Sequence, residues 1–554
     1  MSLHPQPVGP VPEETARVAR AAFPKGNRAV RMRDAIGVMF TDDSFAPVFS
    51  WRGQPAETPW RLALVTIMQY AEGLSDRQAA DAVRGRIDWK YALSLELTDP
   101  GFDSSVLSEF RTRLVTGGME HLLLDQMLAQ FRERNLLTAR GRQRTDSTHV
   151  LAAIRTLNRL ERAGETLRHA LNSLAIVAPD WLRAQSQPEW IDRYSRRVDD
   201  YHLPKGQEAR RALAVTIGQD GVTLLNAIAA AGAPVCLRTI PAVETLRRMW
   251  IQQYVVIDET LGWRSEEHGV PPSALFISSP HDVEAYYGKK HSLLWVGYKV
   301  HLTETCEDEL PRLITHVETS SAPTADGDLT PTIHRALADK GLLPAMHIVD
   351  TGYLDAALLV SSKRDFGVDL YGPTRQDYHW QARAGHGFAA SAFMIDWKAK
   401  TATCPAGHTS ISWSPAIDRR DNAVIKIKFS TKDCRPCASR ALCIQSAQER
   451  SPRRLITIRA HPEFLALHAA RERERHEGFK SEYARRAGIE GTISQGTRAF
   501  GLRRCRYIGL AKTHLQHVLT AAAINFVRAS EWIDGTPVAK TRRSAFATLM
   551  ASAA

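Results

Sequence analysis

The chain has few cysteines, no long apolar run and no recognisable signal sequence. Seven cysteines in 554 residues are too few for a disulfide scaffold. A membrane-spanning helix needs about 18 consecutive apolar residues, and the longest apolar stretches, such as 521–527, are much shorter. The N-terminus lacks the basic start and apolar stretch of a secretory signal peptide. We therefore expect a soluble protein in the reducing cytoplasm, without membrane contact.

Length and positive charge are what the chain has in excess. Its 554 residues make about three to four domains of usual size, which excludes a single small binding module. The 72 Lys and Arg residues outnumber the 60 Asp and Glu residues, giving a net charge of +12. Such an excess favours a polyanionic partner, either nucleic acid or an anionic surface.

Changes of residue pattern along the chain predict a helical N-terminal part followed by an interrupted α/β core. Residues 73–93 are compatible with a helix-turn-helix module that binds DNA and, equally, with a purely structural bundle. After them, three strand-like runs, a helical run and a further strand-like run predict an α/β sheet. The expected division is a flexible tail (1–25), a helical N-terminal domain (26–140), the first part of the core (141–373) with a helical insertion at about 155–280, a β-rich cysteine-containing insertion (374–460), the C-terminal part of the core (461–535) and a basic tail (536–554).

Three acidic residues stand out by their surroundings. Asp146 in RTDSTHV and Asp350 in HIVDTGY lie in or just after apolar strands, whereas Glu490 in RRAGIEGTIS lies in a helical pattern. An unpaired carboxylate in such a strand is costly and needs a metal ion, a cation or hydrogen bonds. Mg²⁺ is one solution, since it binds carboxylate oxygens and leaves positions open for phosphate. The alternatives are turn or cap residues for the two aspartates and a solvated helix residue for Glu490.

The C-terminal block carries a more specific pattern. Tyr483, Arg486 and Glu490 form a Tyr-x2-Arg-x3-Glu arrangement, followed by GTRAFGLRRCRYIGLAKTHLQHVLTAAAINFVR. Together with TDSTHV and VDTGY, these blocks resemble the DDE transposases of bacterial insertion sequences. One departure is Thr497, which stands where that group has a lysine seven residues after the glutamate; Arg498 follows it.

The resemblance implies a fold, an activity and a cofactor. The fold would be a ribonuclease H-like mixed sheet, with the N-terminal domain and both insertions added to it. Asp146, Asp350 and Glu490 would be the catalytic residues, binding Mg²⁺ or Mn²⁺ for cleavage and strand transfer of DNA. The partner would be double-stranded DNA, both element ends and target, bound by a homo-oligomer.

Basic residues are concentrated near Glu490. Residues 471–512 hold eleven Lys and Arg against five Glu, a net charge of +6. Such a strip fits a track for DNA phosphates, although the alternating charges of 471–477 are typical of a solvated, salt-bridged helix face. Tyr483, in the same stretch, could stack on a DNA base or pack in the protein core. The predicted DNA-contacting residues are Tyr483, Arg486, Arg498, Arg503, Arg504, Arg506 and Lys512.

Four of the seven cysteines lie within 40 residues, in the spacing Cys404-x3-His408 and Cys434-x2-Cys437-x5-Cys443. Tetrahedral Zn²⁺ accepts ligands from paired loops of this kind, and buried free thiols are the competing interpretation.

Three further polar residues are interpreted mainly as structural rather than functional. His149, three residues after Asp146, could orient a carboxylate or contact DNA, but a core histidine is the favoured interpretation. Asp326 and Asp328 are interpreted as surface turn residues.

Two other functions fit the same residues. One is a non-catalytic DNA-binding protein with a zinc ribbon, and the other is a metal-dependent nuclease without strand transfer. Convergence of the three acids in space would favour catalysis over the first, whereas only strand-transfer products would exclude the second.

Overall fold

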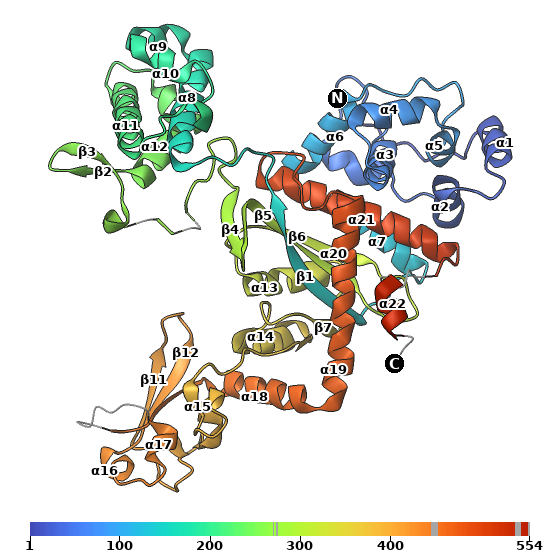
Figure 1. Ribbon diagram of the computed structural model, residues 1–554. Helices are drawn as coiled ribbons and strands as arrows, with labels where there is room; N and C mark the ends of the chain where they lie inside the picture. Colours follow the sequence, from blue (N-terminus) through green and yellow to red (C-terminus); the bar gives the residue numbers. More distant parts are fainter. Residues whose placement is uncertain (270, 273–274, 445–451, 538–544, 552–554) are drawn as a thin grey trace.

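The computed structural model describes residues 1–269, 271–272, 275–444, 452–537 and 545–551. Its centre is a six-stranded mixed sheet with the strand order β4-β5-β1-β7-β8, in which β6 also pairs with β5 (Figure 1). Strand β5 is antiparallel to β1, β6 and β4 (Tyr286–Lys290), whereas β7 and β8 run parallel to β1. The other strands are β1 (Arg142–Leu151), β5 (Leu293–Thr305), β6 (Ile314–Ser321), β7 (Met346–Ile348) and β8 (Asp369–Tyr371). The expected α/β fold with a ribonuclease H-like core is confirmed.

Helices cover the sheet and join it to the N-terminal region. The longest, α21 (Leu510–Ile533), packs against β6 and also against the N-terminal helices α3 and α7. Its side chains from Leu515 to Ala529 are mostly buried, and they share one continuous hydrophobic core with the sheet and the N-terminal helices. The shorter helices beside the sheet are α13 (Thr330–Asp339) and α14 (Ala356–Phe366).

The N-terminal region is a set of short helices. They are α1 (Glu13–Ala22), α2 (Arg28–Ile36), the 3-10 helix η1 (Asp42–Val48), α3 (Pro59–Glu72), α4 (Asp76–Gly85), α5 (Ile87–Ala92), α6 (Ser105–Thr116) and α7 (Leu122–Glu133). Ser75 caps α4 in a capping box with Gln78, where the sequence predicts a helix start.

The prediction of a flexible tail at residues 1–25 is wrong. Helix α1 packs against α5, with Ala19 fully buried and the Thr15 hydroxyl donating to the Leu95 carbonyl at 2.8 Å. The backbone of Ser2 pairs with that of residues 50–56. Four prolines precede α1 and Pro24 follows it, so none interrupts the ten-residue helix and its small apolar face can dock.

The helical insertion has its own hydrophobic core. Its helices are α8 (Arg159–Val177), α9 (Pro179–Gln185), α10 (Pro188–Tyr194), α11 (Gln207–Ala229) and α12 (Pro241–Gln253), and a hairpin of β2 (Tyr254–Ile257) and β3 (Thr260–Trp263) follows them. Helix α11 alone among the described helices is long and apolar enough for a membrane span by length and composition. It packs here as a core helix: Gly218 and Gly221 make room for the rings of Tyr254 and Trp250, whose OH and Nε1–H groups donate to its carbonyls.

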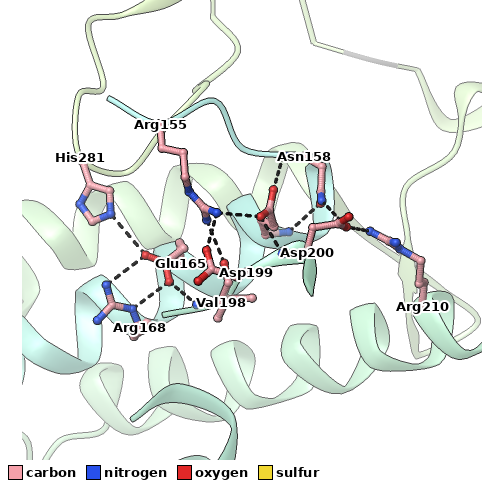
Figure 2. A network of polar contacts seen from close by, with 10 residues as sticks. Arg155, Asn158, Glu165, Arg168, Val198, Asp199, Asp200, Arg210 and His281 are labelled. Carbon is pink, nitrogen blue, oxygen red and sulfur yellow. Dashed lines mark hydrogen bonds and ion pairs between the residues drawn. The ribbon is translucent and has the colours of Figure 1, made fainter. Parts of the chain in front are cut away.

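A polar network fixes the base of this insertion (Figure 2). The buried carboxylate of Glu165 on α8 accepts hydrogen bonds from Arg168 at 2.9 Å and from the backbone N–H of Val198 at 2.6 Å, and it lies 3.4 Å from His281. Arg155, on the segment that leaves β1, pairs with Asp199. The network therefore ties the outgoing and returning segments to the first helix.

The β-rich insertion lies at the far end of α18, away from the central sheet (Figure 1). Its strands form a pair, β9 (Met394–Asp396) and β10 (Thr401–Thr403), and an antiparallel sheet, β11 (Ser412–Ile417), β12 (Ala423–Lys428) and β13 (Leu455–Arg459). Three one-turn helices accompany them, α15 (Trp380–Arg383), α16 (Thr431–Cys434) and α17 (Arg440–Cys443).

The C-terminal helical pattern is divided in three. Helix α18 (His461–Arg475) ends at His476, whose extended backbone turns the chain into α19 (Glu477–Ala484), and α20 (Gly488–Ala499) follows after a single 3-10 turn. In the predicted basic tail, residues 538–544 and 552–554 lie outside the described residues, and α22 (Ala545–Ala551) is a short helix.

Candidate active site

The two candidate aspartates are brought together by the register of two parallel strands. Asp146 lies on β1, and Asp350 follows the last residue of β7 by two positions. The pairing of Arg144 with Ile348 sets an offset of 204 residues, and the same offset separates Asp146 from Asp350. The two side chains are therefore level at the edge where β7 ends.

One guanidinium lies among all three candidate acids. Arg486 Nη2 is 2.7 Å from Asp146 Oδ2 and 3.7 Å from Asp350 Oδ2, and its Nη1 is 3.5 Å from Glu490 Oε1. The last pair spans one turn of the helical segment at the start of α20. The side chain of Asp146 is only 11% exposed, whereas that of Glu490 is 68% exposed. The three acids thus surround a single cation, with Asp146 at the buried end and Glu490 at the rim.

Burial and charge act against each other at this site. Burial raises the pKa of Asp146 above its ordinary value, while Arg486 and the backbone N–H of Ser147 oppose the rise. Burial lowers the pKa of Arg486, but the surrounding carboxylates outweigh it and the net pKa is raised. The guanidinium therefore stays charged and stabilises a carboxylate that would otherwise be unpaired.

The donor set suits a hard divalent cation. Carboxylate oxygens are the ligands that Mg²⁺ prefers, and Arg486 already holds a positive charge between these three. Within the described part of the chain, no three His, Cys, Asp or Glu side chains stand ready in metal-ligand geometry. The site is thus arranged around Arg486, and a metal ion bound by the acids would compete with its ion pairs.

The structure adds a fourth carboxylate that the sequence did not single out. Asp326 lies beside the turn that follows Asp350, pairs with Lys299 at 2.8 Å and accepts a hydrogen bond from the hydroxyl of Ser147 at 3.4 Å. The interpretation of Asp326 as a surface turn residue is therefore wrong, because half-buried partners hold it. Asp328, by contrast, is exposed. No local sequence feature distinguishes Asp326 from Asp328.

A buried hydrogen-bond chain holds the Asp350 turn. The backbone N–H of Gly352 donates to Asp350 Oδ1 at 2.8 Å, and the next residue, Tyr353, is fully buried. The Tyr353 hydroxyl lies 2.6 Å from His301 Nδ1, whose Nε2 lies 3.1 Å from the hydroxyl of Ser320. Burial lowers the pKa of His301 to about 4, so the ring is neutral at neutral pH. Tyr353, whose backbone N–H donates to the Asp350 carbonyl at 3.2 Å, thus ties the Asp350 turn to β5 and β6.

A second buried network anchors the helix that carries Glu490. Glu304 on β5 is 0% exposed and accepts hydrogen bonds from Arg144 at 2.7 Å, Thr492 at 2.6 Å and Arg528 at 2.9 Å. Thr492 is two residues from Glu490. At the start of α20, Gly488 has no Cβ, and a methyl group there would collide with the guanidinium of Arg144. Sheet, α20 and α21 are thus joined by one carboxylate, which sequence inspection did not reveal.

The residues predicted to contact DNA have different environments. Arg498 and Lys512 are exposed, and so is Arg504. Arg506 is also exposed and lies over the ring of Tyr70 at 4.7 Å. These four remain candidates for phosphate contact.

The other three residues predicted to contact DNA make contacts within the protein. Tyr483 is half-buried and stacks on Phe479, with ring centroids 5.6 Å apart. Arg503 donates through Nε to the hydroxyl of Thr148 at 2.8 Å. Arg486 pairs with the acids. His149 is half-buried with its ring 5.6 Å from that of Trp295.

The cysteine cluster is in the β-rich insertion, apart from the acids (Figure 1). Cys404, His408, Cys434, Cys437 and Cys443 line one small cavity.

Comparison with known families agrees with this geometry. Residues 403–529, which include α20 with Glu490 and most of α21, match a family profile described as "Transposase DDE domain". Residues 17–113, the N-terminal helices, match a second profile described as "Transposase domain (DUF772)". No curated protein matches the chain. The two matches, at opposite ends of a chain with a ribonuclease H-like core, indicate a DDE-type transposase of an insertion sequence.

Proposed function

We propose that this transposase binds the ends of its mobile DNA element, cleaves a strand there and joins the freed 3′-hydroxyl to target DNA. The observation that carries the proposal is the gathering of Asp146, Asp350 and Glu490 around one guanidinium. The family match to a DDE domain supports it.

The acids would hold Mg²⁺ or Mn²⁺ during the reaction. Bound there, two such ions would supply the charge that stabilises the attacking and leaving oxygens of an in-line displacement at phosphorus. The chain's own groups do the positioning. Sheet register fixes Asp146 beside Asp350, and the Glu304 network holds α20 so that Glu490 reaches the same place. Arg486 lies between the three carboxylates and offsets part of the cost of burying Asp146 beside them.

The DNA surface would combine two basic regions. Arg498, Arg504, Arg506 and Lys512 are exposed on the segment that includes the candidate active site. The β-rich insertion, residues 374–460, has 15 Lys and Arg against six Asp and Glu, a net charge of +9. Most of the protein's excess charge is thus in this insertion, where it can contact phosphates irrespective of base sequence.

Base recognition is assigned to the N-terminal helices, with α4 and α5 as the helix-turn-helix candidate. Two protomers would be needed to pair two DNA ends, and we place the reaction in the cytoplasm, where thiols stay reduced.

Convergence of the acids favours catalysis over a non-catalytic DNA-binding protein. A scaffold that only binds DNA has no need to bring a buried aspartate beside two further acids, because such a cluster is costly unless cations offset it. A nuclease without strand transfer would use the same residues, so the product of the reaction must separate the two.

The test is strand cleavage and joining of a labelled element end in Mg²⁺, with the variants Asp146→Asn, Asp350→Asn and Glu490→Gln. Each should abolish both products and leave binding of the end in Ca²⁺ or without metal nearly unchanged. The matched control is Asp365→Asn, an exposed acid paired with Arg364 on α14, which should keep full activity. Cleavage retained in the Glu490→Gln variant would overturn the site assignment. Cleavage by wild type without any joined product would favour the nuclease.

A further inference from the structure

The cysteine cluster is a chemical site that the proposed reaction does not use. Cys404 follows β10, Cys434 is the last residue of α16, and Cys443 is the last residue of α17. With Cys437 and His408 they line one cavity of about 30 Å³, which is room for about one water molecule or one metal ion. All four thiols are free.

The first ligand loop has the backbone geometry of a metal-binding turn. The N–H of His408 donates to Cys404 Sγ at 3.4 Å, and the N–H of Gly407 donates to the Cys404 carbonyl at 2.9 Å. Gly407 has φ +85°, a conformation that favours glycine. These two hydrogen bonds close a tight turn that places Cys404 at the cavity.

The second half of the cluster comes from two short helical turns. Cys434 and Cys437 are three residues apart, so their side chains can face one centre. The backbone N–H of Arg440 donates to the Cys437 carbonyl at 3.0 Å, and this bond begins the turn that ends at Cys443. The guanidinium of Arg454 donates to the Cys443 carbonyl at 3.2 Å and to the Phe388 carbonyl at 3.1 Å. Arg454 thus ties the backbone at the end of α17 to the segment that holds Phe388, beside the cavity.

The surrounding subdomain is too small and too basic to be held by its own core. Among its described residues, the buried apolar cluster is small and consists of Phe393, Ala402, Ile427, Phe429, Ile456 and Ile458. The net charge of +9 over residues 374–460 adds self-repulsion. A structural metal ion or a disulfide adds stability to a small core, and in the reducing cytoplasm where we place the protein a metal ion is the favoured of the two.

We propose that Cys404, Cys434, Cys437 and Cys443 bind one structural Zn²⁺, which ties the β10–β11 loop to α16 and α17. Zinc takes four thiolates in a tetrahedron at about 2.3 Å. The described thiols are not yet in that geometry, so the ion draws them inward by rotation of their side chains. His408 supports the loop through its backbone and is not a ligand. The proposal rests on the β-rich insertion alone and is independent of the acids.

The experiment uses the full chain, purified under reducing conditions without added zinc. Elemental analysis should give about one zinc per chain for a single tetrahedral site. The Cys434→Ser/Cys437→Ser variant should lose the zinc, and the matched control Cys236→Ser, an exposed cysteine of the helical insertion, should keep it. His408→Ala should also keep it.

A variant that fails to fold does not decide the matter, so metal exchange in wild type provides a second measurement. Replacement of zinc by Co²⁺ should give the visible absorption of tetrahedral thiolate coordination. Wild-type protein with reduced thiols and neither bound zinc nor a cobalt spectrum overturns the proposal, as does a Cys434–Cys437 disulfide. Loss of zinc from His408→Ala overturns the ligand set. The Asp146→Asn variant should keep its zinc whether or not it cleaves DNA, so failure of the catalytic assignment and failure of the zinc site are distinguishable.

Discussion

Replacement of Arg486 by Met tests the electrostatics of the candidate active site most directly. The substitution keeps much of the side-chain volume and removes the cation 2.7 Å from Asp146. Two unit charges about 3 to 4 Å apart attract by about 4 to 5 kcal/mol at an effective dielectric constant near 20. Removing one partner of a buried pair costs about 3 to 5 kcal/mol. Asp350 at 3.7 Å adds to this, whereas Glu490 adds little because it is mostly exposed.

The same change should strengthen metal binding, because in the wild type an incoming divalent ion must displace the ion pairs of Arg486. We expect Arg486→Met to bind Mn²⁺ about tenfold more tightly, a gain of about 1.4 kcal/mol, while it unfolds more easily without metal. Isothermal titration with Mn²⁺ and thermal unfolding with and without Mn²⁺ measure the two effects. The control is Arg364→Met, which removes an exposed arginine paired with Asp365. Equal or weaker Mn²⁺ binding by Arg486→Met would refute the idea that the acids form a cation site held by Arg486.

Three further predictions concern the anchoring network, acid stability and DNA contact. Glu304→Gln should lower the free energy of unfolding by about 3 to 5 kcal/mol, because it leaves Arg144 and Arg528 without their carboxylate. Hydrogen exchange should show faster opening of α20, and DNA cleavage should fall. Unchanged exchange in α20 would contradict the anchoring role of Glu304. Burial lowers the pKa of His121 to about 2, so below about pH 6.5 the unfolded chain binds a proton that the folded chain does not, and the free energy of unfolding falls by about 1.4 kcal/mol per pH unit. The His121→Gln variant should show a smaller loss in urea unfolding between pH 7.5 and 5.5. The same slope in the variant and the wild type would contradict this. Arg504→Ala should lower the slope of log affinity against log salt by about 1 for element-end DNA, whereas an unchanged slope would exclude a phosphate contact.

Most of the fold was predictable from residue pattern. The strands around Asp146 and Asp350, the helical insertion and the β-rich insertion each have a local periodicity, because the chain must bury apolar side chains at the spacing of its own secondary structure. The error at residues 1–25 has the same origin. Its prolines suggested disorder, but the docking of α1 depends on a surface of α5 that lies far away in the sequence.

Sequence alone determined which side chains could carry the chemistry: two aspartates at buried strands, a glutamate four residues after an arginine, and four clustered cysteines. Only the tertiary structure decided how they meet. It moved Arg486 from a predicted DNA contact to the centre of the acids, added Asp326, and revealed Glu304 as the anchor of α20. The physical reason is that these contacts join residues up to about 340 positions apart, and the register of β1 with β7 and the packing of α20 on the sheet set their distances, which no local pattern encodes.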